Sequence, residues 1–197
     1  MASVLIPARP APPTYPPRRS LLVGSAFATT GAAMFVLTLV GLYLSARHAS
    51  NGAWFKTPDA INIPLTQPNM QFLTLLVSSV MMQWAVYAIA RNYRSHAYLA
   101  LGITVLTGLA FVNQSLFLFK QMGLKMSAQE GPYFYALAGG HVALVCIGIV
   151  FIFLMTFRAL GGQFSSRYPD GLSAAAIYWH TMVGLYGVIW LAVYIAK

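Results

Sequence analysis

Apolar residues dominate five long stretches of the chain, and short polar segments separate them. The stretches lie near 21–46, 69–92, 96–119, 132–158 and 172–196. Each reaches the roughly 20 residues that an α-helix needs to cross the hydrocarbon layer of a bilayer. The pattern therefore predicts an all-α integral membrane protein in which five transmembrane helices form a bundle over residues 21–197.

Charged residues and prolines bound every one of these stretches. The bounding residues are Arg18 and Arg19, Arg47, Pro68, Arg91, Arg94, Lys120, Glu130 with Pro132, Arg158, Pro169 with Asp170, and Lys197. Residues 1–20 precede the first span and contain six prolines, without the apolar run that a cleavable signal needs. We expect an extended, Pro-rich cytoplasmic arm with polyproline II character, with a partner-docking peptide as the alternative.

The distribution of Lys and Arg gives the expected orientation, because cytoplasmic loops carry the larger share of these residues. With the N-terminus inside, the cytoplasmic side holds seven cations and the other side five. The seven are Arg9, Arg18, Arg19, Arg91, Arg94, Arg158 and Arg167; the five are Arg47, Lys56, Lys120, Lys125 and Lys197. The excess predicts an N-in, C-out topology.

Composition agrees with a membrane protein and argues against a nucleic-acid-binding one. Only 8% of the residues are charged and 58% are hydrophobic, whereas soluble domains carry about 25% charge. The net charge of +9 could suggest nucleic acid, but the cations are spread between apolar runs rather than gathered on one face. They match charges that flank membrane spans. The single cysteine, Cys146, excludes an internal disulfide.

Acidic residues are absent from all five predicted spans. The chain has three, Asp59, Glu130 and Asp170, and each falls in a predicted loop. Proton relays and ion-coupled transporters usually carry acids inside the membrane. With no internal repeat visible either, a small transporter is a disfavoured alternative.

Two histidines, His141 and His180, lie within predicted spans, one on the fourth and one on the fifth. Neither belongs to a metal-binding pattern such as HExxH, so we expect no metal site. Counting about 1.5 Å per residue from the span ends predicts levels that differ by several Å, which strains a shared haem. We expect neutral, hydrogen-bonded packing residues, and Gln114 as an interhelical hydrogen-bond partner.

Small residues recur at helical spacing on two spans. Ser20, Gly24, Ala28 and Ala32 form a ladder on the first span, and Ala176, His180 and Gly184 form a stripe on the last. In lipid, such ladders let another helix approach closely. The sequence therefore predicts close helix packing along both.

Several segments, in order, resemble subunit III of the haem-copper oxidases, the cytochrome c oxidase subunit III family, in its five-helix bacterial form. The resemblance covers residues 21–197. The segments are MFVLTLVGLYLSAR in the first span, INIPLTQPNMQFLTLLVSSVMMQWAVYAIAR before and in the second, FYALAGGHVALVCIG in the fourth and YWHTMV in the fifth. YWHTMV is similar to the family's Tyr-Trp-His-Phe-Val-Asp signature.

The resemblance implies a non-catalytic accessory subunit of an oxidoreductase complex in a bacterial inner membrane. Such a subunit binds no cofactor, stabilises the haem- and copper-bearing subunit I, and holds phospholipids. By position, Gln114, His141, Tyr178, Trp179 and His180 would be lipid-contact or helix-packing residues. The alternative from the residues alone is a b-type cytochrome or electron-transfer subunit with haem on His141 and His180.

The chain departs from the family at each buried acid. Ala32, Phe117 and Val183 stand where the family has acidic residues, and Leu144 stands where it has a second histidine. These departures weaken any role in proton uptake that the resemblance would imply.

Overall fold

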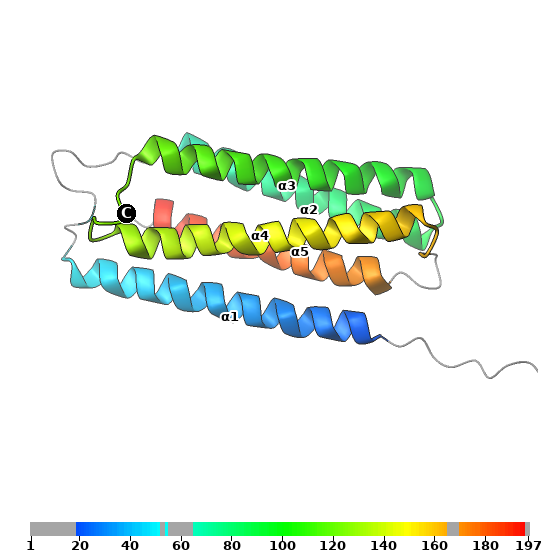
Figure 1. Cartoon of the computed structure of the whole chain (residues 1–197), viewed down its shortest axis with the longest axis horizontal. Coiled ribbons are helices and arrows are strands. Elements are labelled where there is room, and N and C mark those ends of the chain that lie inside the picture. The colour runs from blue at the N-terminus through cyan, green and yellow to red at the C-terminus, as the bar shows by residue number, and fades with distance from the viewer. Residues whose placement is uncertain (1–18, 52–53, 55–64, 165–169, 196–197) are drawn as a thin grey trace, which may run out of the picture.

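A computed structural model describes residues 19–51, 54, 65–164 and 170–195, and it shows a bundle of five long helices (Figure 1). They are α1 (Ser20–Ala49), α2 (Thr66–Ala90), α3 (Arg94–Met122), α4 (Gly131–Leu160) and α5 (Asp170–Ile189), with α5 continuing as the π-helical segment η1 (Trp190–Ile195). All five are long and apolar enough to cross a membrane. The prediction of an all-helical chain with five helices able to cross a membrane is therefore confirmed. Residues 1–18 lie outside the described residues, so the Pro-rich arm stays a prediction.

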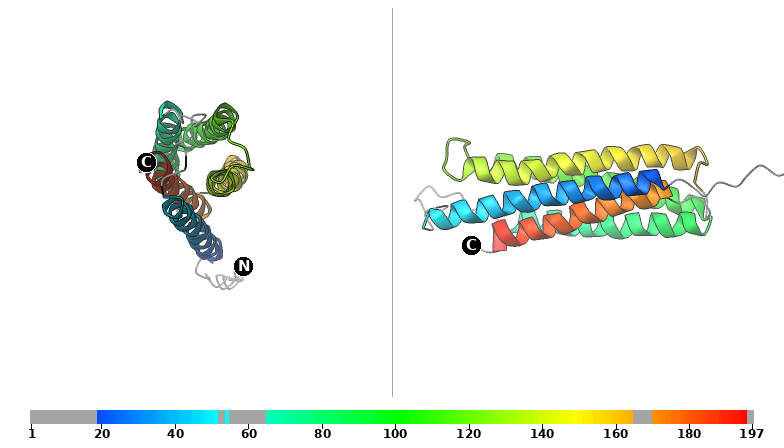
Figure 2. Two further views of the ribbon diagram at one scale, coloured as in Figure 1. Left: turned by 90° about the vertical axis from the view of Figure 1, so that its left-hand side faces the viewer. Right: turned by 90° about the horizontal axis from the view of Figure 1, so that it is seen from below.

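Consecutive helices run antiparallel along the long axis of the bundle, so α1, α3 and α5 share one direction (Figure 1). The start of α1 and the end of η1 lie at opposite ends of the bundle (Figure 1). Seen along the axis, α5 lies between α1 and α2, with α4 beside it (Figure 2). Half of the residues in the apolar window of α5 are buried, against 28% in that of α1. Helix α5 is thus the central element, against which α1, α2 and α4 pack.

Helix α1 packs with a face other than the predicted small-residue ladder. Its buried residues are Ser25, Thr29, Ala32, Val36, Val40 and Tyr43, at the spacing of one helical face. Ser25 fixes this face, because its hydroxyl donates to the backbone oxygen of Ala174 on α5 at 2.7 Å. Ser20, Gly24 and Ala28 are exposed, so among the described helices only Ala32 of that ladder is packed.

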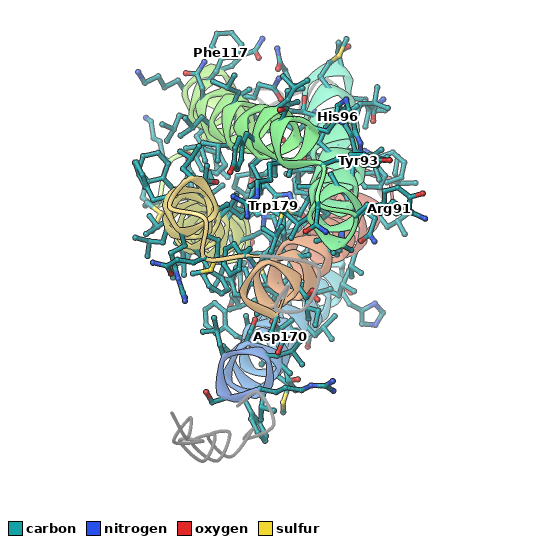
Figure 3. All side chains as sticks on the ribbon, turned by 90° about the vertical axis from the view of Figure 1, so that its right-hand side faces the viewer. Arg91, Tyr93, His96, Phe117, Asp170 and Trp179 are labelled. Atoms are coloured by element: carbon teal, nitrogen blue, oxygen red, sulfur yellow. The ribbon has the colours of Figure 1, made fainter. Side chains whose placement is uncertain are left out.

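Aromatic and basic residues mark the end of the bundle where α2 turns into α3. Asn92 adopts a left-handed conformation (φ 59°) that closes the turn. The Arg91 guanidinium lies 3.5 Å from the centre of the Tyr87 ring, and Tyr93 and His96 form an edge-to-face pair. Figure 3 shows Arg91, Tyr93 and His96 together at this corner. Such groups are typical of the membrane–water interface.

Candidate functional site

Trp179 of α5 lies in the interior of the bundle and contacts three other helices (Figure 3). A Cβ on Gly108 of α3 would lie 2.9 Å from the Trp179 ring, and one on Gly148 of α4 would lie 3.1 Å from it. Both glycines are therefore required for the close approach of the indole. The indole Nε1–H donates to the Ser78 hydroxyl of α2 at 2.8 Å. One side chain thereby joins α2, α3, α4 and α5.

Tyr178, next to Trp179, ties α5 to α4. Its hydroxyl donates to the backbone oxygen of Leu144 at 2.9 Å, and its ring lies edge-on to Phe151. A Cβ on Gly148 would lie 2.9 Å from the Tyr178 ring. The absence of a side chain at Gly148 therefore makes room for both aromatic rings.

His141 of α4 is 1% exposed and hydrogen-bonded to α5. Its Nε2 lies 2.9 Å from the backbone oxygen of Met182. A carbonyl oxygen only accepts, so Nε2 carries the proton and donates it. The imidazole also lies edge-on to Phe111 of α3 and beside Tyr186 of α5. The imidazole is therefore enclosed by side chains of α3, α4 and α5.

His180 of α5 bonds to α2 instead. Its Nδ1 lies 2.6 Å from the Ser79 hydroxyl oxygen, and its Nε2 lies 3.1 Å from Gln83 Oε1. The amide oxygen only accepts, so Nε2 donates to Gln83 and, in the neutral imidazole, Nδ1 accepts from the Ser79 hydroxyl. Both nitrogens of this half-buried ring are therefore engaged.

The geometry of the two histidines argues against a shared haem for a reason that the sequence did not reveal. His141 Nε2 reaches the backbone oxygen of Met182, which lies two residues or about 3 Å along α5 from His180. The two imidazole rings point in different directions, because that of His141 lies between α3, α4 and α5 and that of His180 lies between α5 and α2. Each Nε2 already donates to protein oxygen. Among the described residues, no three His, Cys, Asp or Glu side chains gather as a metal site.

Further polar side chains form hydrogen bonds between α2 and its neighbours. Gln114 Nε2 of α3 lies 3.4 Å from the Thr74 hydroxyl, the kind of contact that the sequence predicted. A second network, which the sequence did not predict, joins Tyr186, Gln71 and Ser115. The Tyr186 hydroxyl donates to Gln71 Oε1, and Gln71 Nε2 lies 3.5 Å from Ser115 Oγ. The signal in the sequence that could have indicated this network is Gln71, a polar residue close to the start of the predicted span 69–92.

Substitution of His141 separates a packing role from a ligand or proton-carrying role. We expect His141→Gln to leave stability and turnover of any assembled complex near normal, because glutamine keeps a donor for Met182. His141→Leu should lower the free energy of unfolding by about 1 kcal/mol, since one interhelical hydrogen bond is lost. Thermal unfolding in detergent measures both. Loss of turnover in a folded, assembled His141→Gln complex would show that the packing role is wrong.

Comparison with known proteins finds related sequences over most of the chain. The family model described as cytochrome c oxidase subunit III matches residues 23–197. Cytochrome c oxidase subunit 3 of Syncerus caffer is 31% identical over 171 residues, which cover 82% of this chain and 63% of the relative. The protein of the same name from Rattus norvegicus is 32% identical over 150 residues, covering 76% and 56%. The chain thus spans about six-tenths of the length of the curated relatives it matches.

Proposed function

The chain belongs to the cytochrome c oxidase subunit III family, and from that premise we propose that it is a non-catalytic membrane subunit of a respiratory terminal oxidase. In this role it packs against a partner subunit that carries haem and copper, and it holds no cofactor itself. The observation that carries the proposal is that its buried polar side chains form hydrogen bonds within the bundle. Those of His141, Trp179 and His180 hydrogen-bond to neighbouring helices.

The side chains at the positions of the family's acids fit a role in stabilising the complex better than a role in proton uptake. Ala32 and Val183 are buried apolar residues at positions where the resemblance places acids. Phe117, at a third such position, is 53% exposed and points outward from α3 (Figure 3). None of these side chains can exchange a proton. We therefore assign the chain a structural task, and propose that it works in the inner membrane of a bacterium with phospholipids around its outer surface.

We expect the N-in, C-out topology in that membrane. Among the described cations, Arg19, Arg91, Arg94 and Arg158 lie at the end of the bundle where α1 begins, and Arg47, Lys120 and Lys125 lie at the other. The positive-inside rule places the first end in the cytoplasm. A C-terminal alkaline phosphatase fusion should therefore be active, and a C-terminal green fluorescent protein fusion should be dark. A fluorescent fusion with an inactive phosphatase would reverse the assignment.

Purification of the full-length chain with an affinity tag tests the proposed function. We expect a larger membrane subunit to be retained in mild detergent and to show the absorption spectrum of haem. An unrelated tagged five-helix protein from the same membranes controls for carry-over. Recovery of the folded chain alone, at the expression level of the native gene, would contradict the proposal.

A further inference from the structure

A small cavity lies inside the bundle, where α2, α3 and α4 meet α5 and its continuation η1. Its volume is about 10 Å³, which is about the room that one water molecule needs. Aromatic and aliphatic side chains form part of its wall, and polar side chains form the rest. The polar lining residues are Gln71, Ser115, His141, Tyr186 and Tyr194. Because the cavity has no room for a lipid chain, these polar groups decide what it can hold.

Tyr194 of η1 brings a hydroxyl group to this cavity that no described residue satisfies. Its side chain is 3% exposed, and its hydroxyl forms no hydrogen bond to the part of the chain that the structure describes. The other tyrosine of the cavity, Tyr186, instead donates to Gln71 Oε1. A buried hydroxyl without a partner is costly, because water no longer solvates it. Tyr194 therefore needs a partner that the described helices do not supply.

The hydrogen-bond network beside Tyr194 also has unused capacity. Gln71 Nε2 lies 3.5 Å from Ser115 Oγ, and its second hydrogen has no acceptor among the described residues. The Tyr186 hydroxyl donates to Gln71, so its lone pairs can accept. His141 uses Nε2 for Met182, which leaves Nδ1 as a further acceptor. The lining thus offers donors on Tyr194 and Gln71, and acceptors on Tyr186 and His141.

Water matches this set of groups better than an ion or an apolar guest does. A buried water accepts and donates, and it typically makes about three hydrogen bonds. The described lining contains no Lys, Arg, Asp or Glu, so the charge of an ion would have no counter-charge there. An apolar gas molecule or methyl group would leave the hydroxyl of Tyr194 without a partner.

We propose that this cavity is a binding site for one water molecule, which bridges Tyr194 of η1 to the Gln71–Tyr186 hydrogen-bonded pair of α2 and α5. The water accepts from Tyr194 and Gln71 and donates to Tyr186. It thereby holds the end of the fifth span against α2, beside the direct bond from Trp190 Nε1 to Asn69 Oδ1. This site lies within a single chain, so it is independent of the proposed function.

A crystal structure of the full chain grown in a lipid phase, at a resolution that shows ordered waters, tests the site directly. We expect one compact peak at hydrogen-bond distance, about 2.7–3.2 Å, from the Tyr194 hydroxyl oxygen and from Gln71 or Tyr186. An empty cavity, or elongated density that continues into lipid, would contradict the proposal. So would a direct bond from Tyr194 to the hydroxyl of Tyr43, which is buried without a partner among the described residues.

Removing the Tyr194 hydroxyl tests what the water contributes. Tyr194→Phe should lower the melting temperature of the chain in detergent by about 2–4 °C, the shift expected when one buried hydrogen-bonded group is lost from a chain of this size. Tyr133→Phe is the matched control, because Tyr133 at the start of α4 is 40% exposed, and it should leave the melting temperature unchanged. Equal shifts in the two variants would overturn the site.

A double variant tests whether the water joins the two side chains. Tyr194→Phe and Gln71→Leu each remove one donor to the same water. Once the water is lost, the second substitution has less left to remove. We therefore expect the melting temperature of the double variant to fall by less than the sum of the two single shifts. Strictly additive shifts would mean that no water bridges Tyr194 and Gln71.

Discussion

Replacing Trp179 with alanine should lower the free energy of unfolding by about 3–5 kcal/mol, the range for truncation of a large buried aromatic side chain. The indole is fully buried and fills the space between Gly108 and Gly148. Because the two glycines have no side chains that could move into the cavity, the structure around it can relax only in part. Equilibrium unfolding in mixed micelles, followed by circular dichroism, measures the change.

Two further variants make this result interpretable. Trp179→Phe keeps most of the volume but loses the hydrogen bond to Ser78, so we expect a cost of about 1–2 kcal/mol. Phe117→Ala removes an aromatic side chain of α3 that is 53% exposed, and it should have little effect. If Trp179→Ala were no more destabilising than Phe117→Ala, the central role of Trp179 would be wrong.

Replacing Gly148 with leucine should be destabilising by about 1–3 kcal/mol or prevent the native packing of α4 on α5. Even a Cβ at this position would lie 2.9 Å from the Tyr178 ring and 3.1 Å from the Trp179 ring. Both rings are held by hydrogen bonds and by packing, so neither can move aside without breaking a contact. The melting temperature of the purified chain in detergent is the readout.

Gly139→Leu is the matched control for Gly148→Leu. It lies on the same helix, and a Cβ there meets no heavy atom within 4 Å. We expect it to be neutral or slightly stabilising, because leucine is the better helix former. Equal loss of stability in the two variants would mean that the effect comes from helix backbone changes rather than from the aromatic contacts.

The spans could be predicted from sequence because length and hydropathy alone identify them. The face with which each helix packs could not be predicted from sequence. Phe27 and Met34 on α1 are apolar and exposed, whereas Ser25 and Thr29 are polar and buried. In a bilayer the outer surface is as apolar as the interior, so hydrophobic periodicity does not separate the two faces. Among the described helices, Ala32 is therefore the only residue of the small-residue ladder on α1 that is packed as predicted.

The candidate site was predicted in part. Trp179, His141 and His180 were chosen for their type and their place in a motif, and all three lie between helices. Their partners, such as Gly108, Ser78 and Met182, are distant in sequence. The depth estimate for the histidines counted residues from the span ends and took no account of where each side chain points. Helix rotation and side-chain direction come only from the assembled bundle.

The most direct test of the central claim is to locate the haem in the purified complex. The absorption spectrum is recorded for the tagged complex, and again for this chain after detergent has separated it from its partner. We predict that the Soret band is present in the complex and stays entirely with the partner. A Soret band that remains stoichiometrically with the separated chain would contradict the proposal of a cofactor-free packing subunit.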